Sequence, residues 1–303
     1  MRKLLVIGIV GLAAQLVDGA LGMAYGVTSS SLMLATGLTP AAASASVHLS
    51  ELGTTLVSGA SHWKFGNVDW RMVLRLGVPG AAGAFAGATF LSNLSTESAA
   101  PWMAGILLAL GVYVLLRFTF GRIATRPDRT PLRSRFLAPL GLVAGFIDAT
   151  GGGGWGPVAT PTLLVSGRVE PRKVVGSVDT SEFLVALAAS IGFLLGIGNE
   201  GVKAGYVLAL LAGGLVAAPV AAYLVRRFPP KMLGSLVGGV IVLTNSRTLV
   251  REFEISGGVA AAVYLLIVAG WVAAVAYSFA AVRRERVLAD EREAWIAARV
   301  ALD

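Results

Sequence analysis

Residues 145–164 read GFIDATGGGGWGPVATPTLL, and this stretch sets the plan of the whole chain. An acid, Asp148, lies in an apolar run, and four consecutive glycines follow it at 151–154. Each glycine inside a helix costs about 1 kcal/mol relative to alanine. We therefore predict that one apolar helix ends here and that another begins beyond the glycines.

The same pattern occurs near the start of the chain. Residues 11–26 read GLAAQLVDGALGMAYG, and residues 141–156 read GLVAGFIDATGGGGWG. With this offset of 130, Asp18 matches Asp148. A second motif follows in the same order, SVHLSE at 46–51 and SVDTSE at 177–182. Two matched motifs in one order indicate a duplicated unit of roughly 120 residues.

The composition predicts a polytopic membrane protein. Of the 303 residues, 55% are hydrophobic and 14% are charged, with a mean hydropathy of +0.75, whereas soluble domains are about 25% charged. The net charge of +8 comes from residues in short loops between apolar runs, which indicates membrane topology and not a nucleic-acid partner. Without cysteine, and with two histidines, the chain offers little for a metal site, and we expect no metal and no cofactor.

The apolar runs fall into two classes by length, because a crossing of the ~30 Å hydrocarbon core needs about 20 residues. Runs long enough to cross are 41–61, 72–91, 101–118, 174–195, 204–225, 232–248 and 257–282. Shorter runs flank the two glycine-rich links, at 4–17, 27–38, 136–147 and 158–165. The first of these resembles a signal peptide, but its counterpart lies in the middle of the chain, so we expect it to be part of the fold.

Each short pair forms either one interrupted crossing or a re-entrant hairpin. If the pairs return to their starting side, 20 of the 25 Lys and Arg residues lie on the cytoplasmic side; if they cross, 14 do. The positive-inside rule favours the hairpins. The predicted fold is an all-α polytopic membrane protein with two inverted repeats, each a glycine-interrupted re-entrant hairpin plus three spanning helices, and one extra C-terminal span.

The N-terminus is expected outside and the C-terminus in the cytoplasm. The expected divisions are a first repeat at 1–118, a basic cytoplasmic loop at 119–135, a second repeat at 136–250, the extra span at 257–282 and a cytoplasmic tail at 283–303.

Broken helices at matched positions of inverted repeats are typical of secondary transporters with a site near the bilayer midplane. A helix that begins inside the membrane has free N–H groups and a positive dipole end, which can hold an anion without a buried base. We expect these half-helices to begin near Val27 and Val158. The predicted substrate-binding residues are Tyr25, Thr28, Ser29, Ser30, Gly151, Gly152, Gly153, Gly154, Trp155 and Thr160.

Ionisable residues inside a membrane cost about 2.5–3.5 kcal/mol each and indicate function by default. The candidates are His48 and five carboxylates, Asp18, Glu51, Asp148, Asp179 and Glu182. The two matched aspartates, at 18 and 148, have a second interpretation as caps of the broken helices, and the two glutamates one as interfacial residues. Carboxylates next to an anion repel it unless they are protonated, so we predict that these groups are either structural or proton-coupling.

The motif FID at 146–148, the four glycines and PTL at 161–163 resemble the glycine motif of the TauE/SafE family of sulfite exporters, also called 4-toluene sulfonate uptake permeases. The size, the duplication and the basic central loop are similar too. The resemblance implies a carrier for sulfite, organosulfonates or related small anions in the bacterial cytoplasmic membrane. The first repeat departs from the motif, since it has no glycine run and Ser31 stands opposite Pro161.

Several functions remain open at this point. Export of a monoanion from an inside-negative cell is favoured by about 2.3 kcal/mol per 100 mV, whereas uptake needs a coupling proton or sodium ion. We therefore expect a non-enzymatic exporter, with a passive anion channel or a proton-coupled organosulfonate permease as alternatives. A cation carrier that uses Asp148 and Glu182, and a membrane protease that uses Ser61 and His62, are more distant alternatives.

Overall fold

The computed structural model describes residues 2–21, 23–121, 132–166, 168–224 and 229–300. Within these ranges the chain forms helices and no strand, which confirms the all-α class. The helices are α1 (Arg2–Leu21), α2 (Tyr25–Ala35), α3 (Pro40–Lys64), α4 (Trp70–Asn93), α5 (Thr96–Phe120), α6 (Ser134–Gly151), α7 (Trp155–Val165), α8 (Pro171–Gly201), α9 (Ala204–Leu224), α10 (Pro230–Glu252) and α11 (Gly257–Val300). Most of the predicted loop at 119–135 lies outside the described residues.

Five helices are long and apolar enough to cross a membrane, namely α4, α5, α8, α10 and α11. Two further predicted spans do not meet this criterion. Helix α3 has 25 residues but carries serines, two histidines and a glutamate, which lower its hydropathy. Helix α9 counts only as a shorter apolar stretch, Ala204–Ala217, among the described residues.

Two helix pairs are broken as the glycine-rich links predict, α1 from α2 and α6 from α7. Helices α2 and α7 have 11 residues each, which is about 16 Å of helix and half of the ~30 Å core. The expected starts near Val27 and Val158 were wrong by a few residues, because α2 begins at Tyr25 and α7 at Trp155. Gly151 still belongs to α6, so the non-helical link is shorter than the four glycines.

The central packing pairs elements from the two halves. Helix α1 lies along α9, α6 lies along α4, and α3 lies along α8. The matched glycines Gly11 and Gly141 occupy equivalent crossings, since a Cβ on either would overlap the backbone of Leu210 or Leu76 respectively. Small residues at such crossings let helix backbones approach closely in membranes.

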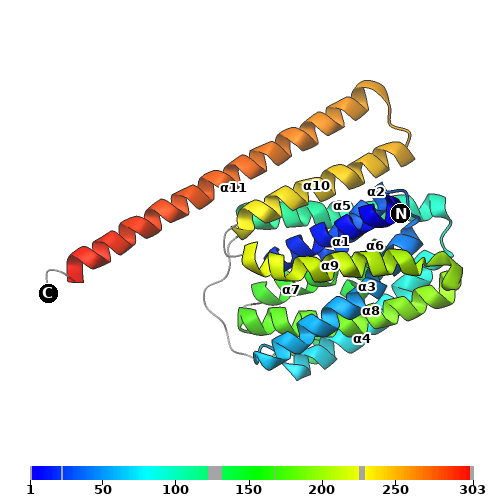
Figure 1. Cartoon of the computed structure of the whole chain (residues 1–303), viewed down its shortest axis with the longest axis horizontal. Coiled ribbons are helices and arrows are strands. Elements are labelled where there is room, and N and C mark those ends of the chain that lie inside the picture. Colours follow the sequence, from blue (N-terminus) through cyan, green and yellow to red (C-terminus); the bar gives the residue numbers. More distant parts are fainter. Residues whose placement is uncertain (1, 22, 122–131, 167, 225–228, 301–303) are drawn as a thin grey trace.

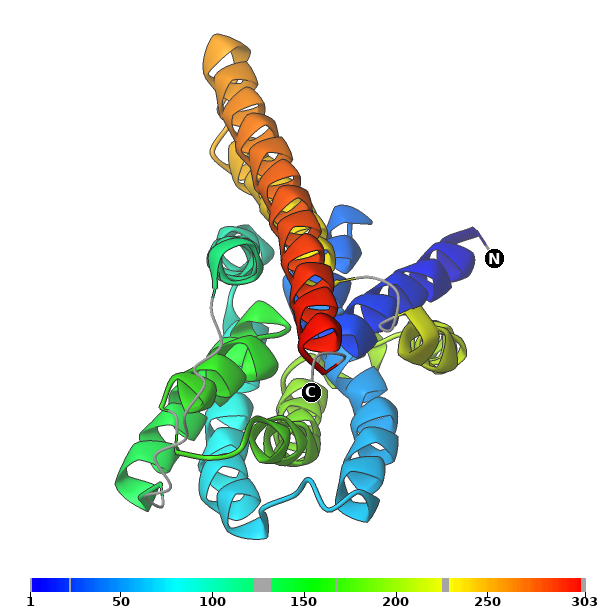
Figure 2. The same cartoon turned by 90° about the vertical axis from the view of Figure 1, so that its left-hand side faces the viewer.

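Helix α11 lies outside this bundle. It runs past α10 and extends well beyond the other helices (Figure 1), and the end view shows it across the outer side of the bundle (Figure 2). Its contact with α10 includes a hydrogen bond from Trp271 Nε1 to the Ser235 carbonyl, 3.1 Å long. Only 6% of its most apolar stretch of 18 residues is buried against the rest of the structure, as expected of a helix that faces lipid.

Candidate functional site

Both helix breaks are capped by the matched aspartates. The Asp18 carboxylate accepts a hydrogen bond from the Tyr25 backbone N–H at 3.2 Å. The Asp148 carboxylate accepts one from the Trp155 N–H at 2.9 Å. Each acid thus satisfies the first free donor of the half-helix that follows seven residues later. Both aspartates thus make the hydrogen bonds expected of caps, and these bonds explain why α2 and α7 begin where they do.

The two breaks lie against each other at the centre of the bundle. A Cβ added to Gly153 would overlap the backbone of Gly26 and Val27, and the Ser30 hydroxyl donates to the Gly152 carbonyl. Gly152 has a φ of 68° and Gly153 one of 152°, a region that favours glycine. Glycine is required here because the two links touch through their backbones.

The first turn of each half-helix carries N–H groups that have no acceptor within the helix itself. The first donors of a helix have no intrahelical acceptor, and the caps use those of Tyr25 and Trp155. Pro157 has no N–H, which leaves Gly156 at α7 and Gly26 at α2 next to the break. Both glycines line the same cavity, so the first turns of the half-helices from both halves of the chain border one space.

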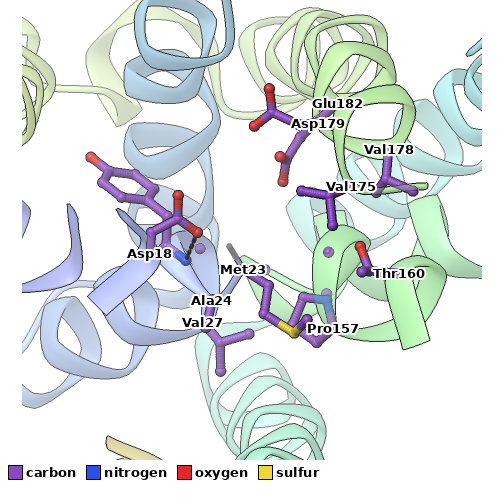
Figure 3. A pocket seen from close by; sticks show the side chains of 15 residues that line it. Asp18, Met23, Ala24, Val27, Pro157, Thr160, Val175, Val178, Asp179 and Glu182 are labelled. Atoms are coloured by element: carbon purple, nitrogen blue, oxygen red, sulfur yellow. Dashed lines mark hydrogen bonds between the residues drawn. The ribbon is translucent and has the colours of Figure 1, made fainter. Parts of the chain in front are cut away.

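This cavity lies between α1, α2, α7 and α8 and has a free volume of about 20 Å³. Such a volume holds about one water, so a larger anion needs the helices to separate. Figure 3 shows carboxylates reaching into the space from different sides, Asp18 from α1 and Asp179 and Glu182 from α8, with Thr160 of α7 across from them. Among the described residues, no Lys or Arg lines it.

The structure brings part of the predicted set to this cavity. Predicted residues that line it are Asp18, Tyr25, Gly153, Gly154, Thr160, Asp179 and Glu182. Predicted residues that lie away from its walls are Thr28, Ser29, Ser30, Glu51, Asp148, Gly151, Gly152 and Trp155. Lining residues that the sequence did not single out include Met23 and Pro157, and neither carries a signal beyond its proximity to a glycine link.

The matched aromatic residues differ in position. The Trp155 side chain is fully buried, and its indole N–H donates to the Val178 carbonyl at 3.0 Å. Tyr25 instead lines the cavity, and its hydroxyl lies 3.2 Å from the Ser50 hydroxyl. Trp155 therefore ties α7 to α8, while Tyr25 remains part of the cavity wall.

A buried ion pair joins the two halves beside the cavity. His48 Nε2 lies 3.1 Å from Asp148 Oδ2, and both side chains are almost completely buried. His48 Nδ1 lies 2.8 Å from the Ser44 carbonyl, which can only accept, and the Ser44 hydroxyl donates to the Ala149 carbonyl. Both ring nitrogens thus face acceptors, and we assign His48 as the imidazolium on this geometry. The sequence indicated His48 but not its partner.

Several buried polar atoms near the breaks have no hydrogen-bond partner among the described residues. They include Thr28 Oγ1, Ser29 Oγ, Glu51 Oε2 and Asp179 Oδ2. Buried polar groups are normally paired, so unpaired ones mark places where a water, proton or ligand interacts. No group of three or more His, Asp or Glu side chains in the described part of the chain has the geometry for a metal ion.

Comparisons with known proteins agree with this architecture. Residues 7–248 match the family model "Sulfite exporter TauE/SafE". The chain is 52% identical over 278 residues to the "Probable membrane transporter protein YtnM" of Bacillus subtilis, covering 91% of this chain and 93% of that protein. It is 27% identical over 202 residues to "Probable membrane transporter protein YdhB" of the same organism, covering 65% and 80%. No solved structure matches significantly. The match over most of the chain, on a bundle of apolar helices, means that the protein belongs to the TauE/SafE family of membrane transporters.

Proposed function

We propose that the protein is a secondary carrier that exports a small sulfur-containing anion, such as sulfite or an organosulfonate, across the bacterial cytoplasmic membrane. The observation that carries this proposal is the meeting of two broken helices at one cavity. In this proposal the backbone N–H groups and positive ends of both half-helices are directed at that space, which is the arrangement expected for an anion site without a buried base. The family description supports the substrate class.

The proposed topology has two inverted repeats with re-entrant hairpins. In support, Arg2 of α1 and Leu38 after α2 line one surface groove, so this pair ends beside the point where it starts. Leu132 before α6 and Arg168 after α7 line another groove. In Figure 1 the N-terminus lies at one end of the bundle, and α10 starts at the other. We propose that the two hairpins enter from opposite sides of the membrane.

The sidedness follows from charge. The groove at Arg168 is also lined by Arg71, Arg75, Arg172 and Lys173, and basic residues collect on the cytoplasmic side. We infer that this end faces the cytoplasm, with the N-terminus outside and the tail after 282 inside. The repeats at 1–118 and 136–250, the link at 119–135 and the extra span at 257–282 follow from this topology.

The proposed binding mode uses the free N–H groups of Gly26 and Gly156 and the Thr160 hydroxyl as donors to the anion oxygens. The free volume of about 20 Å³ means that the anion enters only when α7 moves away from α1 and α2. The backbone contact between Gly153 and Gly26 is the interface that this movement would separate. The same movement would expose three hydroxyl residues of α2 next to this contact, Thr28, Ser29 and Ser30.

The test is transport by the purified protein in liposomes loaded with sulfite. We expect saturable efflux that exceeds the rate of protein-free liposomes and is accelerated by sulfite or a sulfonate on the opposite side, as a carrier requires. Chloride-loaded liposomes are the matched control. Single-channel currents in place of saturation would favour the passive channel, and an absence of selective flux would refute the proposal.

One observation favours a second candidate. Three carboxylates and no base line the cavity among the described residues, which suits a cation better than an anion if all three are ionised. A cation carrier would take up a monovalent cation in the same liposomes without sulfite. A proton-coupled permease for organosulfonates resolves the conflict differently, because protonated carboxyl groups no longer repel the anion.

A further inference from the structure

The repeat relates two pairs of side chains that differ in charge. Asp148 corresponds to Asp18 in the two glycine motifs, and His48 corresponds to Asp179 in the SVHLSE and SVDTSE motifs. In the first pair, the capping residue Asp148 lies 3.1 Å from His48. In the second pair, the capping residue is Asp18, and the position that matches His48 is occupied by Asp179, a second carboxylate at the wall of the cavity.

Asp18 and Asp179 line the same cavity, and no Lys, Arg or His among the described residues lines it with them. Glu182 on the same helix as Asp179 and Tyr25 of α2 line the cavity with them. The titratable side chains next to this group are His48 and Glu51 of α3 and Asp148 of α6. The only base in this set is His48, which is already paired with Asp148. Like charges placed together away from water repel strongly, so the group is not stable with every carboxylate ionised.

Two further atoms indicate that something binds between these carboxylates. Asp179 Oδ2 is buried and has no partner among the described residues. Thr160 is 2% exposed and faces the cavity, yet its hydroxyl makes no hydrogen bond to any described residue. Other threonines in these helices, Thr150, Thr162 and Thr180, donate to the carbonyl four residues earlier. The Thr160 hydroxyl is thus left free to bond to an occupant of the cavity.

We propose that Asp18, Asp179 and Glu182 form a proton-binding site that takes up a proton together with each transported anion. The bound proton occupies the place that the imidazolium of His48 holds in the other half. It binds to a carboxylate oxygen when the anion enters and leaves to water on the opposite side with the anion, so no covalent bond is made or broken in the anion. The proton is favoured over a metal cation because the described residues contain no cluster with metal-binding geometry.

This inference rests on the proposed anion transport but makes a separate prediction. The anion and the proton share one cavity, so each stabilises the other, and anion affinity falls as the pH rises. For one linked proton the change is about tenfold per pH unit above the titration point. A monoanion would then move with no net charge, and a membrane potential would have little effect on its flux.

The first experiment measures proton uptake on binding. Purified protein is titrated with toluenesulfonate, which stays ionised across the pH range, in buffers with different heats of ionisation. We expect about one proton per bound anion for the wild type. Asp179→His places an imidazole opposite Asp18, as His48 lies opposite Asp148, and we expect the proton uptake to disappear. Glu97→Gln, at an exposed position on α5, is the matched control and keeps the wild-type value.

The second experiment needs no ligand. The infrared C=O band of protonated carboxyl groups is followed as the pH is raised, in the wild type, Asp179→His and Asp179→Asn. We expect a band that titrates in the wild type and is reduced in both variants. Asp179→Asn keeps the shape of the side chain, so the test holds if the histidine variant does not fold.

The outcomes separate the two proposals. Toluenesulfonate binding without proton uptake, or an infrared band that is the same in all proteins, overturns the proton site and leaves anion transport standing. Binding that requires sodium and ignores pH also overturns it. If no sulfonate or sulfite binds at any pH while the infrared band titrates and depends on Asp179, the proton site stands and the anion assignment fails.

Discussion

The contact between the two helix breaks gives the sharpest prediction of stability. In Gly153→Ala the new Cβ would overlap the backbone of Gly26 and Val27. The φ of 152° adds strain of about 1–3 kcal/mol for a residue with a Cβ, and overpacking adds about 1–3 kcal/mol. The expected total destabilisation is about 2–6 kcal/mol.

The assay is thermal unfolding in detergent, followed by tryptophan fluorescence. Two matched variants separate the contributions. Gly26→Ala produces the same overlap, with Gly153 Cα at 2.7 Å, but lies within α2, so helix propensity returns about 1 kcal/mol and the net loss is about 0–2 kcal/mol. Gly105→Ala lies in α5 with no atom within 4 Å of its new Cβ and should be neutral or stabilising. If Gly153→Ala unfolds at the temperature of Gly105→Ala, the two breaks do not touch as described.

Two other predictions follow from the capping pair and the charge distribution. Asp148→Asn should destabilise the protein by about 3–5 kcal/mol because it leaves the buried His48 charge without its partner, whereas Asp18→Asn breaks no ion pair and should cost less; equal unfolding temperatures would contradict this difference. The chain has no cysteine, so Glu97→Cys and Glu170→Cys each introduce a single exposed thiol. A membrane-impermeant maleimide should label the first in intact cells and the second only after lysis, and the reverse pattern would refute the proposed topology.

Local patterns in the sequence predicted the helix breaks well. The glycines after each aspartate and the repeat of this motif at an offset of 130 were enough to place both links. The exact starts were missed because the aspartate side chains cap Tyr25 and Trp155, which lets each half-helix begin at the first residue after the link. A proline at 157 does not prevent this, because the first turn of a helix needs no N–H there.

Contacts between distant segments were not predictable in the same way. His48 and Asp148 are 100 residues apart, so no local pattern in the sequence indicates their contact. The repeat gives no help, because it matches His48 to an acid. The repeat also does not predict where the matched aromatic residues lie. Trp155 contacts α8, whereas Tyr25 lines the cavity.

These differences between equivalent positions make the two helix breaks unlike: the break after Asp148 is closed, and the break after Asp18 is open to the cavity. At the closed break, Asp148 caps α7, pairs with His48 and does not line the cavity. The Trp155 side chain joins α7 to α8. At the open break, Asp18 caps α2 but has no histidine partner, and it lines the same cavity as Asp179. A second pair of the His48–Asp148 kind would leave Glu182 as the one unpaired carboxylate at the cavity among the described residues, whereas Asp179 adds another acid there and leaves Asp18 without a base. In the proposed proton site, the aspartate at 179, where the matched position 48 has a histidine, is therefore the difference that leaves a carboxyl group able to take up a proton.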